Sequence, residues 1–71
     1  MAWPPNSQER RRAELYADSP EAEEMLAVML AEYREELLKP IDEMQRDYES
    51  LGDVRVARDL REILKDARGK P

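Results

Sequence analysis

A long stripe of apolar side chains dominates the middle of the chain. Its members are three or four residues apart, which is the spacing that places side chains on one face of an α-helix. The stripe keeps its phase across Pro40, so we expect one helix over residues 20–51, kinked near Pro40; the alternative is a tight break at Lys39-Pro40. The stripe consists of Leu26, Leu30, Tyr33, Leu37, Ile41, Met44, Tyr48 and Leu51.

Helix-start signals precede this stripe at two places. Asn6 with Glu9 three residues later resembles a capping box, and it predicts a short helix over residues 7–17 after an extended arm over residues 1–6. Ser19 is a good N-cap, and proline at the first helical position removes no intrahelical hydrogen bond, so the long helix should begin at Pro20.

A third helix is predicted over residues 53–68. Gly52 can end the long helix, Asp53 can cap the next one, and Gly69 can stop it. Because this turn is short, we expect the last two helices to form an antiparallel hairpin. The predicted fold is all-α, one small domain over residues 1–71, completed by oligomerisation into a helical bundle.

Residues 25–31 are apolar on every side of the expected helix, which is typical of a segment buried from more than one direction. The long helix should span about 48 Å and the last helix only about 24 Å, so the last helix cannot reach this run. The first helix can cover one face, and we therefore expect a second protein chain on the remainder; the alternative is an internal core closed by the first helix and Trp3. The predicted partner-binding residues are Met25, Leu26, Val28, Met29, Leu30, Tyr33 and Trp3.

Charge is distributed unevenly along the chain, whose formal net charge is −5. Residues 20–52 carry ten acidic and three basic residues, whereas residues 53–71 carry six basic and four acidic ones. This difference favours packing of the last helix beside the long one. The basic flank that should face the acidic helix consists of Arg58, Arg61, Lys65 and Arg68.

Catalytic chemistry has little support in this composition. The chain contains no His and no Cys, the residues on which most acid–base, nucleophilic and metal sites depend. The carboxylates have neither a calcium-loop pattern nor a partner His, so we expect solvated faces, no metal, no cofactor and no small-molecule substrate. No apolar run approaches the roughly 20 residues of a membrane span and no signal-peptide pattern opens the chain, so a cytoplasmic location is expected.

The function expected from these patterns is that of a small non-catalytic interaction module or accessory subunit. It would bind itself or another protein through the first half of the long helix. An alternative is an acidic inhibitor that imitates the phosphates of nucleic acid. Nucleic-acid binding through residues 10–12 or the last helix is a further, less favoured hypothesis. The excess of Arg over Lys is typical of bacterial and phage proteins from GC-rich genomes.

Overall fold

Capping side chains determine where the first helix begins. In the computed structural model, which describes residues 3–69, α1 spans Ser7–Tyr16. The Glu9 N–H donates to Asn6 Oδ1 at 2.8 Å, and the Asn6 N–H donates to Glu9 Oε1 at 2.9 Å, so the capping box is complete. Of the expected extended arm, Met1 and Ala2 lie outside the described residues.

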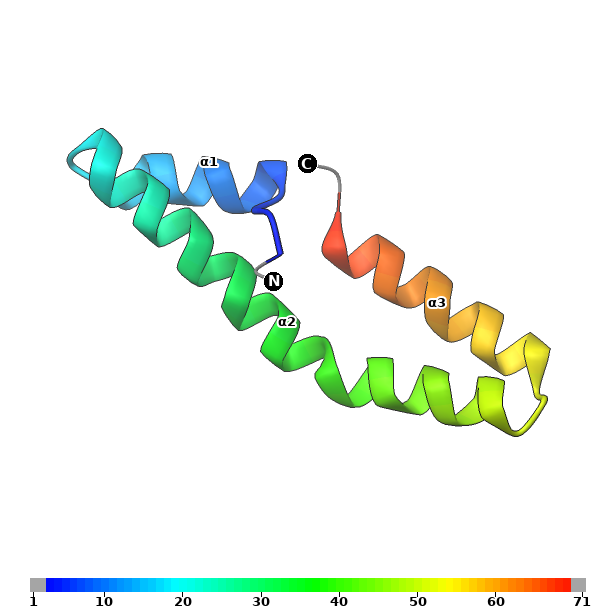
Figure 1. Cartoon of the computed structure of the whole chain (residues 1–71). Coiled ribbons are helices and arrows are strands. Elements are labelled where there is room, and N and C mark those ends of the chain that lie inside the picture. Colours follow the sequence, from blue (N-terminus) through cyan, green and yellow to red (C-terminus); the bar gives the residue numbers. More distant parts are fainter. Residues whose placement is uncertain (1–2, 70–71) are drawn as a thin grey trace.

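The long helix α2 spans Pro20–Ser50 without interruption. Ser19 Oγ accepts a hydrogen bond from the Ala22 N–H at 3.2 Å, and Pro20 occupies the first turn. Pro40 lies inside the helix, and α2 changes direction in its green middle part (Figure 1). The missing proline N–H and the clash of its ring with the preceding turn account for this bend.

The third helix, α3, spans Val54–Arg68 after a tight turn. Gly52 in this turn has φ +82°, a conformation that residues with a Cβ adopt rarely. Asp53 caps α3 by accepting a hydrogen bond from the Val56 N–H. An all-helical fold is therefore confirmed over residues 3–69, and each helix end lies within one residue of its predicted position.

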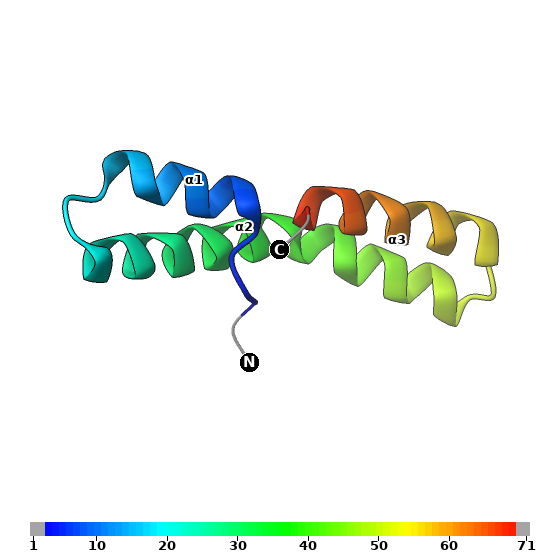
Figure 2. The same cartoon turned by 90° about the horizontal axis from the view of Figure 1, so that it is seen from above.

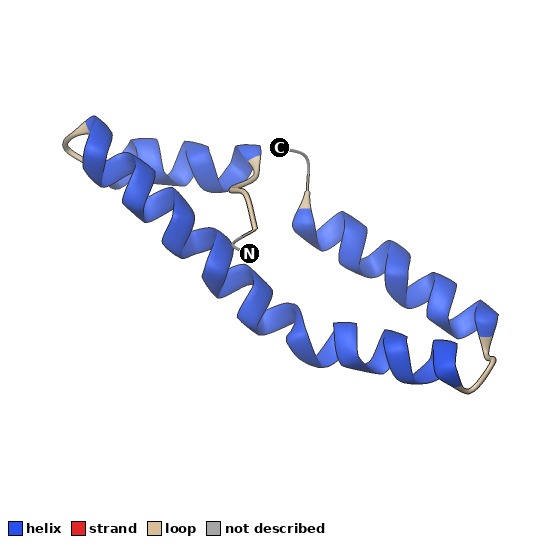
Figure 3. Ribbon diagram, in the orientation of Figure 1, coloured by secondary structure: helices blue, strands red, loops and turns tan. Residues whose placement is uncertain are grey.

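Both short helices run back along α2, one on each half (Figures 1 and 2). Only short loops and turns separate the helices, as Figure 3 shows. Among the described residues, α1 and α3 pack on α2 and not on one another. The result is a slab two helices wide, with extents of 48 × 17 × 15 Å.

The core of this slab is thin and built largely from small side chains. The buried apolar residues are Ala13 of α1, Ala27, Ala31 and Leu38 of α2, and Ala57 and Leu64 of α3. Among the described residues, no large side chain is completely buried. Alanines at the contact let helix axes approach closely, but they bury little apolar area.

The buried side of α2 is not the stripe of large apolar residues. The buried positions are Ala27, Ala31, Leu38 and Gln45, whereas Tyr33 and Leu37 of the apolar stripe are more than 60% exposed. At 3.6 residues per turn, the stripe lies roughly 90° around the helix from the buried line. The large residues of the stripe therefore do not form the centre of the helix contact, because the small residues beside them allow α1 and α3 to pack more closely there.

Candidate protein-binding surface

The predicted partner-binding residues of α2 are divided between exposed and half-buried positions. Met25 is 68% exposed and Met29 is 60% exposed. Leu26, Val28 and Leu30 are half-buried. Because the buried Ala27 and Ala31 lie among them, α1 covers one side of this run and leaves the other side open.

Two adjoining grooves extend the exposed apolar surface across the helices. One, of about 430 Å³, is lined by Leu15, Tyr16, Leu26 and Leu30 together with Arg12. The other, of about 290 Å³, shares Leu30 and Arg12 and reaches Tyr33, Leu37 and Ala67. All three helices therefore contribute to one apolar surface.

We call this surface the apolar face. On α2, helical spacing continues it from Leu37 through Ile41, Met44 and Tyr48, of which Met44 is 49% exposed. On α3, the same side of the helix carries Val56, Leu60 and Ile63, which precede Ala67 at helical spacings of three or four residues. The apolar face thus consists of Leu15, Tyr16, Leu26, Leu30, Tyr33, Leu37, Ile41, Met44, Tyr48, Val56, Leu60, Ile63 and Ala67.

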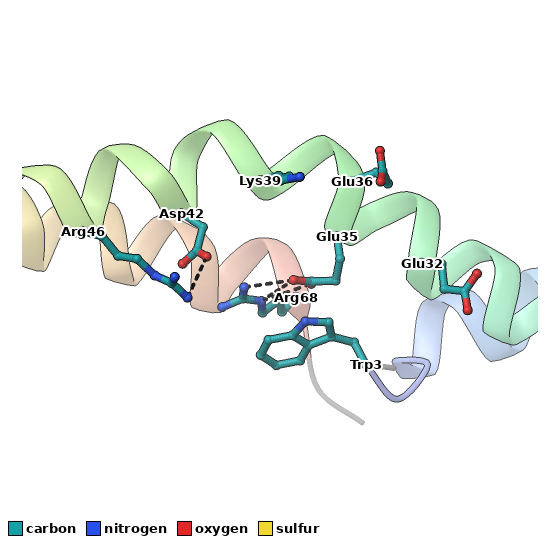
Figure 4. Close-up of a pocket in the computed structure, with 8 residues that line it drawn as sticks. All are labelled: Trp3, Glu32, Glu35, Glu36, Lys39, Asp42, Arg46 and Arg68. Atoms are coloured by element: carbon teal, nitrogen blue, oxygen red, sulfur yellow. Dashed lines mark hydrogen bonds and ion pairs between the residues drawn. The ribbon is translucent and has the colours of Figure 1, made fainter. Parts of the chain in front are cut away.

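Charged side chains collect on the opposite side of the buried line, which we call the charged face. An open groove of about 500 Å³ is found there (Figure 4). Arg46 pairs with Asp42 at 3.3 Å beside it, and Arg61 pairs with Glu49 at 3.2 Å further along α3. The groove is lined by Trp3, Glu32, Glu35, Glu36, Lys39, Asp42, Arg46 and Arg68.

A polar junction joins the beginning of α1 to the end of α3. Arg34 of α2 donates to Glu9 of α1 at 2.6 Å, and both side chains are only 11% exposed. Glu35, the next residue on α2, accepts hydrogen bonds from Arg68 of α3 at 2.9–3.2 Å. Asn6 Nδ2 donates to the Arg68 carbonyl oxygen at 2.7 Å. We call Asn6, Glu9, Arg34, Glu35 and Arg68 the polar junction.

Trp3 belongs to this junction side of the molecule and not to the apolar face. Its ring lies over the Arg68 guanidinium, 4.1 Å from ring centroid to Cζ, and is visible beside Glu35 in Figure 4. This is cation–π geometry. Trp3 is 47% exposed, so it attaches the N-terminal arm through Arg68 and not through a buried apolar core. That Trp3 binds a partner stays a prediction, and its position beside Arg68 separates it from the apolar face.

Members of two groups of basic residues, the predicted basic flank of the last helix and the arginine run at residues 10–12, have acidic partners in the structure. Arg68 and Arg61 of the predicted basic flank contact carboxylates of α2, in keeping with the predicted charge matching. Arg10, from the run at residues 10–12, lies 3.6 Å from Glu24 of α2, and both side chains are more than half exposed. An exposed pair of this kind contributes at most about 1 kcal/mol, so it orients α1 more than it stabilises it.

The environment of Glu35 makes the junction sensitive to acid. Partial burial alone would raise the pKa of Glu35, but hydrogen bonds from Arg68 and Arg34, together with their charges, outweigh it. The pKa of Glu35 is therefore lowered in the folded protein. A carboxylate with a depressed folded pKa adds stability above its unfolded pKa, and that stability disappears as the pH falls through the folded pKa.

We accordingly expect the free energy of unfolding to decrease more steeply below about pH 4 in the wild type than in a Glu35→Gln variant, since unfolded Glu titrates near 4.3. Urea unfolding followed by circular dichroism between pH 3 and pH 7 measures this difference. Glu36→Gln, one residue along on the exposed side, is the matched control. Parallel pH profiles for the wild type and Glu35→Gln would contradict the assignment.

The polar junction was missed in reading the sequence, although one signal for it was present. Arg34 stands three residues after Ala31 and four before Leu38, which is the helical spacing of the buried line. A charged residue in such a line requires a partner of opposite charge close by. The partner, Glu9, is separated from Arg34 by 25 residues, and only the packing of α1 identifies it.

Comparison with known proteins gives no relative: no family model, no curated protein and no solved structure matches this chain. Within residues 3–69, the His, Cys, Asp and Glu side chains form no group of three or more that could hold a metal ion. Nor does any helix in the described part of the chain combine the length and the apolar character needed to cross a membrane.

Proposed function

We propose that this chain is a small, non-catalytic helical interaction module, or the accessory subunit of a larger assembly, and that its apolar face binds protein. One observation supports the proposal above all others. Large apolar side chains such as Tyr33 and Leu37 are more than 60% exposed and gather on one face, while ion-paired side chains gather on the other. Contiguous exposed apolar patches of this kind mark interaction sites in small soluble domains.

The composition of the apolar face suits protein recognition. Tyr16, Tyr33 and Tyr48 combine apolar area with a hydroxyl group that can find a partner at the edge of an interface. Met29, beside this face, and Met44, within it, add unbranched side chains that adapt to the shape of a partner. The face extends over both halves of α2, so the proposed surface is larger than the first half of the long helix. A cytoplasmic location is part of the same proposal.

An acidic nucleic-acid mimic is a weaker alternative. Such an inhibitor needs a row of unpaired carboxylates to occupy a basic groove. Here the acidic side chains alternate with arginines that contact them, and the carboxylates in ion pairs are Glu9, Glu24, Glu35, Asp42 and Glu49. Four of the ten acidic residues of α2 are therefore paired within the molecule, which breaks the row that such a mimic needs.

Site-specific photo-crosslinking tests the proposed function. Tyr33→p-benzoylphenylalanine places a photoreactive group on the apolar face, and the same substitution at Lys39 places one on the charged face, where Lys39 is exposed. We expect irradiation in the expressing cells to give discrete protein adducts from position 33, whether with the same chain or with another, and few from position 39. Equal labelling at the two positions, or adducts from position 39 alone, would overturn the proposal.

A further inference from the structure

We infer that the occupant of the apolar face is a second copy of this chain, packed face to face about a two-fold axis. This inference rests on the proposed function and specifies the partner. It is drawn from three features of the molecule: the surface it exposes, the absence of a completely buried large side chain among residues 3–69, and the distribution of its charge.

The exposed surface is too large for a compact monomer of this mass. The accessible surface is 5911 Å² for an 8.3-kDa chain. Folded monomers of this mass expose about 4,600 Å², which leaves an excess of roughly 1,300 Å². A standard stable interface buries about 800 Å² on each partner, and obligate homodimers bury more. The excess therefore matches what one copy contributes to a homodimer.

Pairing of two copies would also add large side chains to the thin core of each copy. No large side chain in residues 3–69 is completely buried, and the apolar face contains Tyr33, Leu37 and Ile63, each more than half exposed. Each half of the slab is two helices wide, α1 with α2 or α2 with α3. Stacking two slabs by their apolar faces gives four helices in cross-section along the whole length, which is a helical bundle with a continuous core.

The charge distribution permits this pairing despite the net charge of −5 on each copy. The ion pairs of Asp42 and Glu49 lie on the charged face, which points away from the proposed interface. Of the charged groups lining the two apolar grooves, Glu9 is already paired with Arg34, and Arg12 lines both grooves. The carboxylates of the charged face, which carry much of the negative charge of α2, are therefore kept away from the self-complementary surface of a two-fold dimer.

Sedimentation equilibrium of the purified chain tests the inference. We expect a mass twice that of the single chain at micromolar concentration. We also expect pairing to be retained or strengthened at 0.5 M salt, because salt screens repulsion between two acidic copies and does not weaken apolar contact. Tyr33→Glu should weaken dimerisation at least 100-fold, because two copies of the new carboxylate would be buried in the interface. Val54→Glu is the matched control: Val54 is 73% exposed, and helical spacing places it outside the apolar face.

The possible outcomes separate this inference from the proposed function. A wild-type chain that stays monomeric at millimolar concentration overturns the dimer, as does equal weakening by Tyr33→Glu and Val54→Glu. If position 33 then still crosslinks to a different protein, the interaction module stands and its partner is not a second copy. If position 33 crosslinks to nothing, both proposals fail. Should Tyr33→Glu prove unfolded by circular dichroism, Leu37→Lys, at a neighbouring exposed position of the same face, provides the comparison.

Discussion

Replacing Arg34 with alanine should lower the free energy of unfolding by about 3 kcal/mol, because removal of one partner leaves a buried charge uncompensated. Arg34 and Glu9 are each only 11% exposed and lie 2.6 Å apart. The substitution also removes the hydrogen bond from Arg34 to Glu35. Urea unfolding at pH 7 and a fixed protein concentration, followed by circular dichroism, measures the change.

Arg46→Ala is the matched control for this prediction. Arg46 belongs to the same helix and also contacts a carboxylate, Asp42, but its side chain is 74% exposed. Its loss should change the free energy of unfolding by no more than about 0.5 kcal/mol. Similar losses from Arg34→Ala and Arg46→Ala would show that the junction is not the buried electrostatic contact described above.

Replacing Ala31 with leucine should destabilise the protein by about 2–3 kcal/mol, within the range found for overpacked cores. Ala31 has no exposed surface and lies on the side of α2 that packs against α1. A leucine there would force α1 outward and stretch the hydrogen bonds that Asn6 and Arg34 make at its beginning. Thermal unfolding at a fixed concentration measures the effect.

Ala67→Leu is the control for overpacking, because Ala67 is exposed and belongs to the apolar face. Alanine and leucine have similar helix propensities, so helix formation itself should change little in either variant. Because Ala67 lies in the inferred interface between copies, this comparison is made on protein diluted until it is monomeric, where we expect Ala67→Leu to change the free energy of unfolding by no more than about 0.5 kcal/mol. A stable Ala31→Leu variant would mean that α1 does not pack against this position in solution.

Local sequence signals determined the helix ends well. The Asn6–Glu9 capping box, the Ser19-Pro20 start and the glycines after α2 and α3 act within a few residues, so no tertiary information is needed to interpret them. Uninterrupted apolar spacing across Pro40 likewise pointed to one long helix. Each of these inferences depends on chemistry within a single turn or two of the chain.

The orientation of the helices about their axes could not be obtained in this way. Two helical lines run side by side along α2, one of large apolar residues such as Leu37 and one of small residues such as Ala31. Hydrophobicity alone favours burial of the first line, whereas close packing of α1 and α3 against α2 favours burial of the second. The choice depends on how closely the axes approach and on long-range contacts such as Asn6 with Arg68, 62 residues apart. The same choice leaves the large side chains exposed and so creates the candidate binding surface.

The arrangement of α1 and α3 on separate halves of α2 has a consequence for how the chain folds. Nearly all helix packing joins neighbours in the sequence across short turns, so the contact order is low and the entropy of loop closure is small. We therefore expect the α1–α2 and α2–α3 pairs to form independently of each other. We expect the polar junction, whose Asn6 and Arg68 are 62 residues apart, to form last and to join the two helix pairs into one cooperative unit.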